Sequence, residues 1–143
     1  MIRTADILLV EDSPGDIRLT MEALKESRII NNLHIVNDGV EAINFLMKTG
    51  EYAKAQTPDL ILLDLNLPKI NGFEVLKKIK EDETLKVIPV VVLTTSQSER
   101  DILQSYQLHV NCFVSKPIEF DEFFNVIRTI EDFWFTIVKL PKP

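Results

Sequence analysis

The sequence predicts an α/β protein with a doubly wound, five-stranded parallel sheet. Short apolar runs rich in Val, Ile and Leu alternate five times with longer segments of helical periodicity. Residues 60–63 and 90–93 are apolar at every position, which is typical of strands buried on both faces of a parallel sheet. Since 143 residues leave room for one ordinary domain, we expect a single domain over residues 1–143.

Residues 7–10 form the first predicted strand, which ends at Glu11 and Asp12. Ser13 and Pro14 then favour the start of a helix, because Ser caps the first turn and Pro fits its first position. The buried face of this helix is predicted to carry Ile17, Met21 and Leu24.

Residues 33–36 form the second predicted strand. Asp38 and Glu41 then resemble a capping box that opens a second helix, and Gly50 favours its end. The inner face of the helix is predicted to carry Ile43, Leu46 and Met47.

The third strand, residues 60–63, ends at Asp64. A loop with Pro68 follows, and residues 72–79 read as a third helix with acids and bases on its outer side.

The fourth strand, residues 89–93, ends at Thr94 and precedes a short helix over residues 99–106. We expect this to be the least firmly docked helix, because its apolar face is small. That face consists of Ile102, Leu103 and Tyr106.

The fifth strand, residues 112–115, ends at Lys116. The last helix has a strong apolar stripe, made of Phe120, Phe123, Phe124, Ile127, Ile130 and Trp134. Residues 131–143 form a C-terminal extension with more apolar faces than one helix needs to bury, so something should cover it. Two alternatives remain open: the extension folds back on its own domain, or it makes a homodimer contact, which Trp and Phe favour.

Composition excludes several classes of function. The net charge is −6 and the basic residues are scattered, so we expect no nucleic-acid partner. No apolar run approaches the roughly 20 residues of a membrane helix, and the amino terminus lacks the apolar region of a secretory signal. Cys112 is the only cysteine, which excludes an internal disulfide. We therefore expect a cytoplasmic protein without membrane association.

Polar residues end four of the predicted strands, and the carboxyl ends of parallel strands form the usual ligand edge of such a sheet. These residues are Glu11, Asp12, Asp64, Thr94 and Lys116. Crowded carboxylates repel one another, and a divalent cation with oxygen ligands relieves that repulsion, so we expect Mg²⁺. Neither His34 nor His109 has a ligand-spaced partner, which argues against a transition-metal site. A single loop Asp is usually structural, and only the joint arrangement favours a site.

Asp64 is the candidate nucleophile. A carboxylate attacks phosphorus when the incoming negative charge is neutralised, because positioning and electrostatics carry most of phosphoryl transfer. The cation and Lys116 would supply that neutralisation.

Four motifs in this order resemble the receiver domains of two-component response regulators. They are residues 8–12 (LLVED), 62–68 with Gly72 (LLDLNLP), 89–94 (PVVVLT) and Lys116-Pro117. The resemblance extends from about residue 7 to about residue 130, and four spaced motifs are far more specific than one. It implies a flavodoxin-like fold with five helices and strand order 2-1-3-4-5.

The resemblance also implies a role for each matching residue. Asp64 would be the phosphoacceptor, and the Mg²⁺ ligands would be Glu11, Asp12, Asp64 and the backbone carbonyl of Asn66. Thr94 and Lys116 would bind phosphoryl oxygens, and the Lys116–Pro117 bond would be cis. Phe113 stands where receivers have an aromatic residue that follows the threonine inward. Glu11 and Phe113 replace the more common Asp and Tyr, and Thr95 is bulkier than the usual residue, which predicts slower dephosphorylation by water.

The function implied is that of a stand-alone response regulator, which accepts a phosphoryl group from a sensor histidine kinase and signals to a downstream protein. It would not be an enzyme beyond self-catalysed phosphotransfer and autodephosphorylation. One alternative is a pseudo-receiver, a binding module that is not phosphorylated. An aspartyl-phosphate phosphatase is disfavoured because Asn66 stands where such enzymes commonly have a second acid, and a flavin carrier lacks its phosphate loop after Val10.

Two segments are similar to the small response regulators of cyanobacterial phytochromes: residues 131–134 (EDFW) and residues 101–112. This narrower resemblance implies a phytochrome as the kinase and a homodimer through the last helix.

Overall fold

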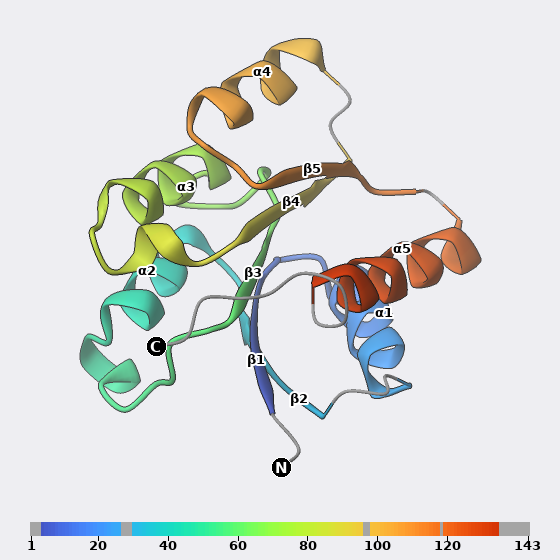
Figure 1. Ribbon diagram of the computed structural model, residues 1–143, viewed down its shortest axis with the longest axis horizontal. Helices are drawn as coiled ribbons and strands as arrows, with labels where there is room; N and C mark the ends of the chain where they lie inside the picture. The colour runs from blue at the N-terminus through green and yellow to red at the C-terminus, as the bar shows by residue number, and fades with distance from the viewer. Residues whose placement is uncertain (1–3, 27–29, 96–97, 118, 135–143) are drawn as a thin grey trace.

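The computed structural model describes residues 4–26, 30–95, 98–117 and 119–134. Across these residues the chain forms a five-stranded parallel sheet in the order β2-β1-β3-β4-β5 (Figure 1). The strands are β1 (Ala5–Val10), β2 (Asn31–Val36), β3 (Leu60–Leu63), β4 (Val90–Thr94) and β5 (Cys112–Ser115). The predicted fold class and strand order are therefore confirmed.

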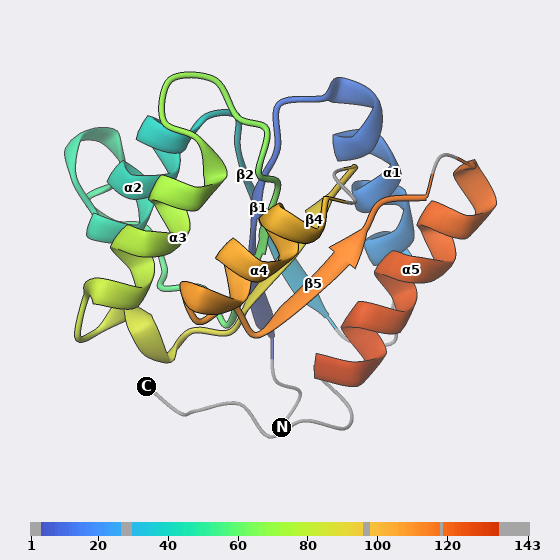
Figure 2. The ribbon, with the colours of Figure 1, turned by 90° about the horizontal axis from the view of Figure 1, so that it is seen from above.

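Helices cover both faces of the sheet. They are α1 (Pro14–Lys25), α2 (Gly39–Met47), α3 (Gly72–Glu81), α4 (Glu99–Gln107) and α5 (Phe120–Asp132), with short 3₁₀ turns at Gly50–Tyr52 and Leu85–Val87. Helices α1 and α5 lie together on one face, and α2, α3 and α4 lie on the other (Figure 2). Among the described residues, no helix is both long and apolar enough to cross a membrane.

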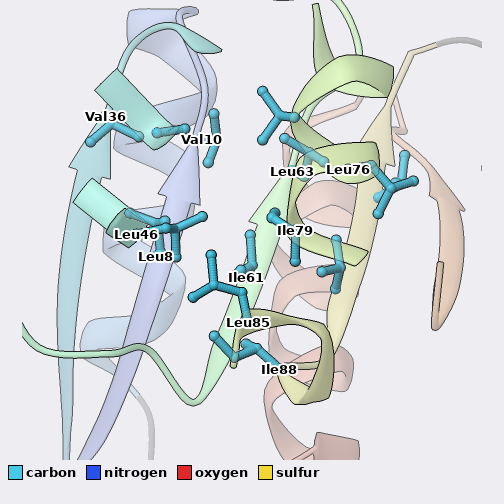
Figure 3. Close-up of a cluster of buried hydrophobic side chains, with 14 of the residues drawn as sticks. Leu8, Val10, Val36, Leu46, Ile61, Leu63, Leu76, Ile79, Leu85 and Ile88 are labelled. Atoms are coloured by element: carbon cyan, nitrogen blue, oxygen red, sulfur yellow. The ribbon is translucent and has the colours of Figure 1, made fainter. Parts of the chain in front are cut away.

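The hydrophobic core is divided by the sheet. One cluster joins the strands to α2 and α3, and its members include Leu8, Val10, Leu46, Ile61, Leu76 and Ile79 (Figure 3). The other joins the opposite side chains of the same strands to α1 and α5, and includes Ile7, Leu9, Leu24, Phe123 and Ile127. All four residues of β3 are buried, as predicted for a central strand covered on both faces.

The strands are paired so that their carboxyl ends are nearly level. Val10 at the end of β1 pairs with Leu63 at the end of β3, and Leu63 pairs with Val92. Thr94 at the end of β4 pairs with Ser115 at the end of β5. The residues that follow these strands are therefore brought to a common edge.

The predicted buried faces of α1 and α2 need correction. In α1, Met21 is 38% exposed, while Thr20 and Ala23 are buried beside Leu24. In α2, Met47 in the last turn is 52% exposed, while Ala42 and Phe45 are buried.

Helix α4 departs furthest from prediction. Leu103 and Tyr106 of its predicted apolar face are 59% and 50% exposed, and Ser105 is the residue that it buries. A helix that turns its apolar side chains to the surface gains little from core packing, which agrees with the expectation that α4 is the least firmly docked helix.

The C-terminal extension is described only as far as Trp134, so the predictions for residues 135–143 lie outside the described residues. Trp134 is half-buried and packs against the core cluster beneath α1 and α5. Phe133 is 45% exposed and meets the Trp134 ring edge-on at 5.5 Å.

Candidate functional site

Glu11, Asp64 and Lys116 meet at the carboxyl edge of the sheet. Each directly follows a strand, and β1 and β3 are neighbours whose last residues are paired. All three side chains are at least nine-tenths buried. The prediction that these residues converge is confirmed.

Lys116 lies at the centre of this site. Its Nζ donates to Oε1 of Glu11, to Oδ2 of Asp16 at 2.9 Å and to Oδ2 of Asp64 at 3.2 Å. The three donors of the ammonium group thus meet three carboxylates. Burial opposes the charged lysine, but the hydrogen bonds to Asp16 and Glu11 and the charge of Asp64 outweigh it and raise the pKa of Lys116.

Asp16 is the member of the site that the sequence did not reveal. It lies in the first turn of α1, with its backbone N–H capped by Ser13 at 3.4 Å. The helix starts within a few residues of the end of β1, so its first turn remains at the carboxyl edge of the sheet. The sequence does show an acid in the first turn of the helix that follows β1. Acids are common in first turns because of the helix dipole, so this signal alone did not identify Asp16.

Glu11 is enclosed, with 2% of its surface exposed. Its Oε2 accepts the backbone N–H groups of Asp12 at 3.1 Å and Ser13 at 3.2 Å, which orients Oε1 toward Lys116. Burial raises the pKa of Glu11 to about 7, against the lowering influence of Lys116. Three carboxylates around one ammonium group leave an excess of negative charge, and a proton on Glu11 reduces it.

The loop after β3 positions Asp64. The Asp64 Oδ1 accepts the backbone N–H of Asn66 at 3.3 Å, and the Asp64 N–H donates to the carbonyl of Val10 at 3.1 Å. Gly72 at the start of α3 lies against this loop, where a Cβ would come within 2.4 Å of the Asp64 carbonyl oxygen. Glycine is therefore required there for the loop to close.

Thr94 is fully buried at the end of β4, and its carbonyl accepts the backbone N–H of Lys116 at 2.6 Å. This bond fixes the end of β5 beside β4. Thr95, by contrast, is exposed. Phe113 in β5 is half-buried and packs against the core cluster on the α2 and α3 side.

One sequence expectation fails in this region. The described residues contain no cis peptide bond, so the Lys116–Pro117 bond is trans rather than cis. The trans form of a bond that precedes proline is favoured by about 0.5–1 kcal/mol in the absence of other constraints.

Three acids are arranged as a possible metal site. Carboxylate oxygens of Glu11, Asp12 and Asp64 all lie within 4.8 Å of one another. Asp12 is exposed, which leaves the group open to solvent on one side. Hard oxygen ligands, an open side for retained waters and excess negative charge fit a divalent cation such as Mg²⁺. The side chain of Asn66 is exposed, and the prediction for this residue concerns its backbone carbonyl.

Comparison with known proteins agrees with this geometry. Residues 7–128 match the response regulator receiver domain. Response regulator Rcp1 of Synechocystis sp. is 53% identical over 135 residues, which are 94% of this chain and 92% of Rcp1. Probable methanogenesis regulatory protein FilR2 of Methanothrix harundinacea is 38% identical, with 96% of this chain and 88% of FilR2 covered.

Solved structures show the same relation. The phosphorylated cyanobacterial phytochrome response regulator RcpA matches with a TM-score of 0.96 and 51% identity, and the match covers 98% of this chain and 100% of RcpA. The Mn²⁺-bound form of Rcp1 matches with a TM-score of 0.94 and 51% identity, covering 96% and 99% of the two chains. From its site, its fold and these relatives, this chain belongs to the response regulator receiver domain family.

Proposed function

We propose that this chain is a phosphorylation switch that accepts a phosphoryl group from a sensor histidine kinase on Asp64, with Mg²⁺ as cofactor. The observation that carries the proposal is the buried Asp64 carboxylate, which lies 3.2 Å from Lys116 and within 4.8 Å of two further acids. The Asp64 carboxylate lies between the buried ammonium group of Lys116 and an acidic group suited to a divalent ion. These are the surroundings that phosphoryl transfer requires.

The proposed metal ligands are Glu11, Asp12, Asp64 and the backbone carbonyl of Asn66. When bound, Mg²⁺ would neutralise charge that develops on the phosphoryl oxygens. An Asp64 oxygen would form the new bond to phosphorus as the bond from phosphorus to the kinase histidine nitrogen breaks, with its electron pair leaving on that nitrogen. The chain itself would contribute no chemistry beyond this transfer and the later hydrolysis of the acyl phosphate by water.

Lys116 would act both before and after the phosphoryl transfer. Before transfer it neutralises the carboxylates around it, including Asp64. After transfer its donors would turn to the phosphoryl oxygens, as would the hydroxyl of Thr94. Because Thr94 and the half-buried Phe113 lie on adjacent strands, inward movement of the first would make room for the second and change the surface near the weakly docked α4.

The proposed kinase is a phytochrome, on the strength of the relatives: RcpA is a phytochrome response regulator, and its structure is of the phosphorylated form. The Mn²⁺-bound form of Rcp1 supports a divalent cation, for which Mg²⁺ is the physiological candidate. We place the exchange in the cytoplasm, where a lone thiol such as Cys112 stays reduced.

Intact-mass analysis after incubation with acetyl phosphate and Mg²⁺ tests the central claim. We expect one phosphoryl adduct in the wild type and none in Asp64→Asn or with a chelator. If no adduct forms and beryllofluoride does not bind either, the chain acts instead as a pseudo-receiver, a protein-interaction module without phosphorylation.

A second proposal concerns the lifetime of the phosphorylated state. The exposed Thr95 directly follows the buried Thr94 at the mouth of the site, where its side chain would restrict the entry of water. Replacing Thr95 with Ala is expected to shorten the half-life of the adduct about threefold, a modest effect consistent with a change in access alone. An unchanged half-life would remove this role.

We also propose a homodimer through the last helix. Helix α5 exposes Phe120, and Phe133 after its end is exposed as well, while Trp134 packs against its own domain. Sedimentation equilibrium is expected to find a dimer at micromolar concentration that Phe133→Ser weakens. A monomeric wild type over that range would contradict the proposal.

A further inference from the structure

The corner between β2 and α2, formed by Asn37 and Asp38, contacts both loops that carry the predicted cation ligands. It contributes no ligand itself. Its neighbours are the loop after β1, which holds Glu11 and Asp12, and the loop after β3, which holds Asp64 and Asn66.

On the first side, Asn37 is bonded to the backbone of Glu11. The Asn37 Nδ2 donates to the Glu11 carbonyl oxygen at 3.2 Å, and the Glu11 N–H donates to the carbonyl of Val36 at 3.0 Å. Both backbone groups of Glu11 are thereby tied to β2 and the corner. The side chain that pairs with Lys116 therefore extends from a fixed main chain.

On the second side, Asp38 pairs with the loop after β3. Its Oδ2 lies 3.3 Å from Nζ of Lys69, with the Asp38 side chain 11% exposed and the Lys69 side chain 65% exposed. Lys69 has a positive φ of 66°, a conformation that is costly for a residue with a side chain and that the surrounding contacts must maintain.

Backbone packing adds to this contact. A Cβ on Gly39 would come within 2.1 Å of the Ile70 carbonyl oxygen, so the loop after β3 lies directly on the first residue of α2. The Asp38 Oδ1 caps α2 by accepting the Glu41 N–H at 2.8 Å, and this bond, with Lys69, lowers the pKa of Asp38. The carboxylate consequently remains charged for its pair with Lys69 at neutral pH.

We infer that the corner is a brace that sets the spacing of the two ligand loops, with Asn37, Asp38 and Lys69 as positioning residues for the divalent cation. The inference rests on the cation site of the proposed function and deepens it. Groups that orient metal ligands without touching the metal commonly control its affinity.

Lys69→Gln is the decisive variant because loss of charge and loss of the brace would change the Kd for Mn²⁺ in opposite directions. Loss of a positive charge near an acidic site should by itself tighten cation binding. Loss of the brace should weaken it, and we expect the Kd for Mn²⁺, measured by electron paramagnetic resonance of the free ion, to rise about threefold. The matched control is Lys77→Gln, since Lys77 is also 65% exposed and, among the described residues, pairs only with Glu81 on its own helix. The Kd of this variant is expected to be unchanged or lower.

Asp38→Asn supplies the partner variant, because Asn retains a side-chain oxygen to cap α2 while losing the charge that holds Lys69. In the Asp38→Asn background, where the pair is already lost, adding Lys69→Gln is expected to cause no further rise in the Kd, and only the charge effect, which lowers the Kd, should be left. Asn37→Ala removes the bond to Glu11 and is expected to raise the Kd about tenfold. Thermal unfolding with a chelator present verifies that each variant is folded.

The outcomes separate this inference from the proposed function. If the wild type binds Mn²⁺ and forms the phosphoryl adduct while Lys69→Gln and Asn37→Ala bind the ion as tightly as the wild type, the brace is refuted and the phosphoacceptor role stands. If the wild type binds no Mn²⁺, the cation role and the brace both fail.

Discussion

Two lysines at opposite ends of the parallel sheet, the buried Lys116 and the half-buried Lys80, have ammonium groups in different surroundings. At the carboxyl end, Lys116 is surrounded by the carboxylates of Glu11, Asp16 and Asp64. At the amino end, Lys80 on α3 donates to neutral oxygens: the Asn111 Oδ1 at 3.0 Å and the carbonyls of Ile88 at 3.3 Å and Lys86 at 3.4 Å. Carboxylates raise the pKa of Lys116, whereas burial lowers the pKa of Lys80.

The difference separates a functional site from a structural one. Lys80 ties the end of α3 to the loops before β4 and β5, and its acceptors are neutral, so they add no negative charge that a second cation would balance. Around Lys116, negative charge exceeds positive charge. A further cation or a proton would therefore stabilise this cluster of carboxylates. We therefore expect the two lysines to respond differently to substitution, pH and Mg²⁺.

The largest expected effect is that of Lys116→Met. Removing one partner of a buried ionic group leaves the carboxylates uncompensated, which typically costs about 3–5 kcal/mol. Urea unfolding at pH 8 with a chelator should show this loss, and millimolar Mg²⁺ should recover part of it. Equal stability of the variant and wild type without cation would show that the carboxylates do not need Lys116.

The effect of pH follows from Glu11. Its pKa of about 7 lies above the ordinary value of 4.5, so between these values the native state binds more protons than the unfolded state. The corresponding stability is fully present below about pH 4.5 and is lost as pH rises through about 7, a loss on the order of 2–3 kcal/mol. Chemical unfolding with a chelator from pH 5 to pH 8 measures it.

Glu11→Gln is the control for this slope, since Gln keeps the size of the side chain and does not titrate. The variant should lose much less stability over the same pH range. A slope identical to that of the wild type would assign the titration to another group.

The smallest effect is expected for Lys80→Met. Its three acceptors lose a shared donor, but Asn111 keeps the Val90 N–H at 2.8 Å, so a cost of about 1–2 kcal/mol is expected. Urea unfolding should show this loss equally with chelator and with Mg²⁺. A change in Mn²⁺ affinity would contradict the view that this end of the sheet is purely structural.

Much of the fold was predictable because hydrophobic periodicity reports directly on buried strands. Residues 60–63 could be predicted to be an interior strand because four consecutive apolar residues are typical of a strand covered on both faces, and all four are buried, as are residues 7–10 and 90–93. The site was predictable for a related reason: strand ends converge in a parallel sheet, so Glu11, Asp64 and Lys116 could be brought together without knowing any side-chain conformation.

What could not be predicted depends on close packing. Hydrophobicity placed Met21 in the core, but the structure buries the smaller Thr20 and Ala23 and leaves Met21 exposed. Hydrophobicity also predicted that Leu103 of α4 faces the core, whereas the structure buries Ser105 and exposes Leu103. Asp16 was missed because acids are common in first turns, and its contact with Lys116 depends on the direction of the first turn of α1.

The pairing of Val10 with Leu63 has a consequence for insertions and deletions. Glu11 and Asp64 are neighbours because each is the first residue beyond the last paired position of its strand. One residue added to β3 would carry Leu63 to the place of Asp64, and one residue removed would carry Leu65 there. Either change would also reverse the faces of the strand beyond it. The chemistry of this chain is thus encoded as much in segment length as in residue type, and a change of one residue in length should be less tolerated in β3 than most substitutions there.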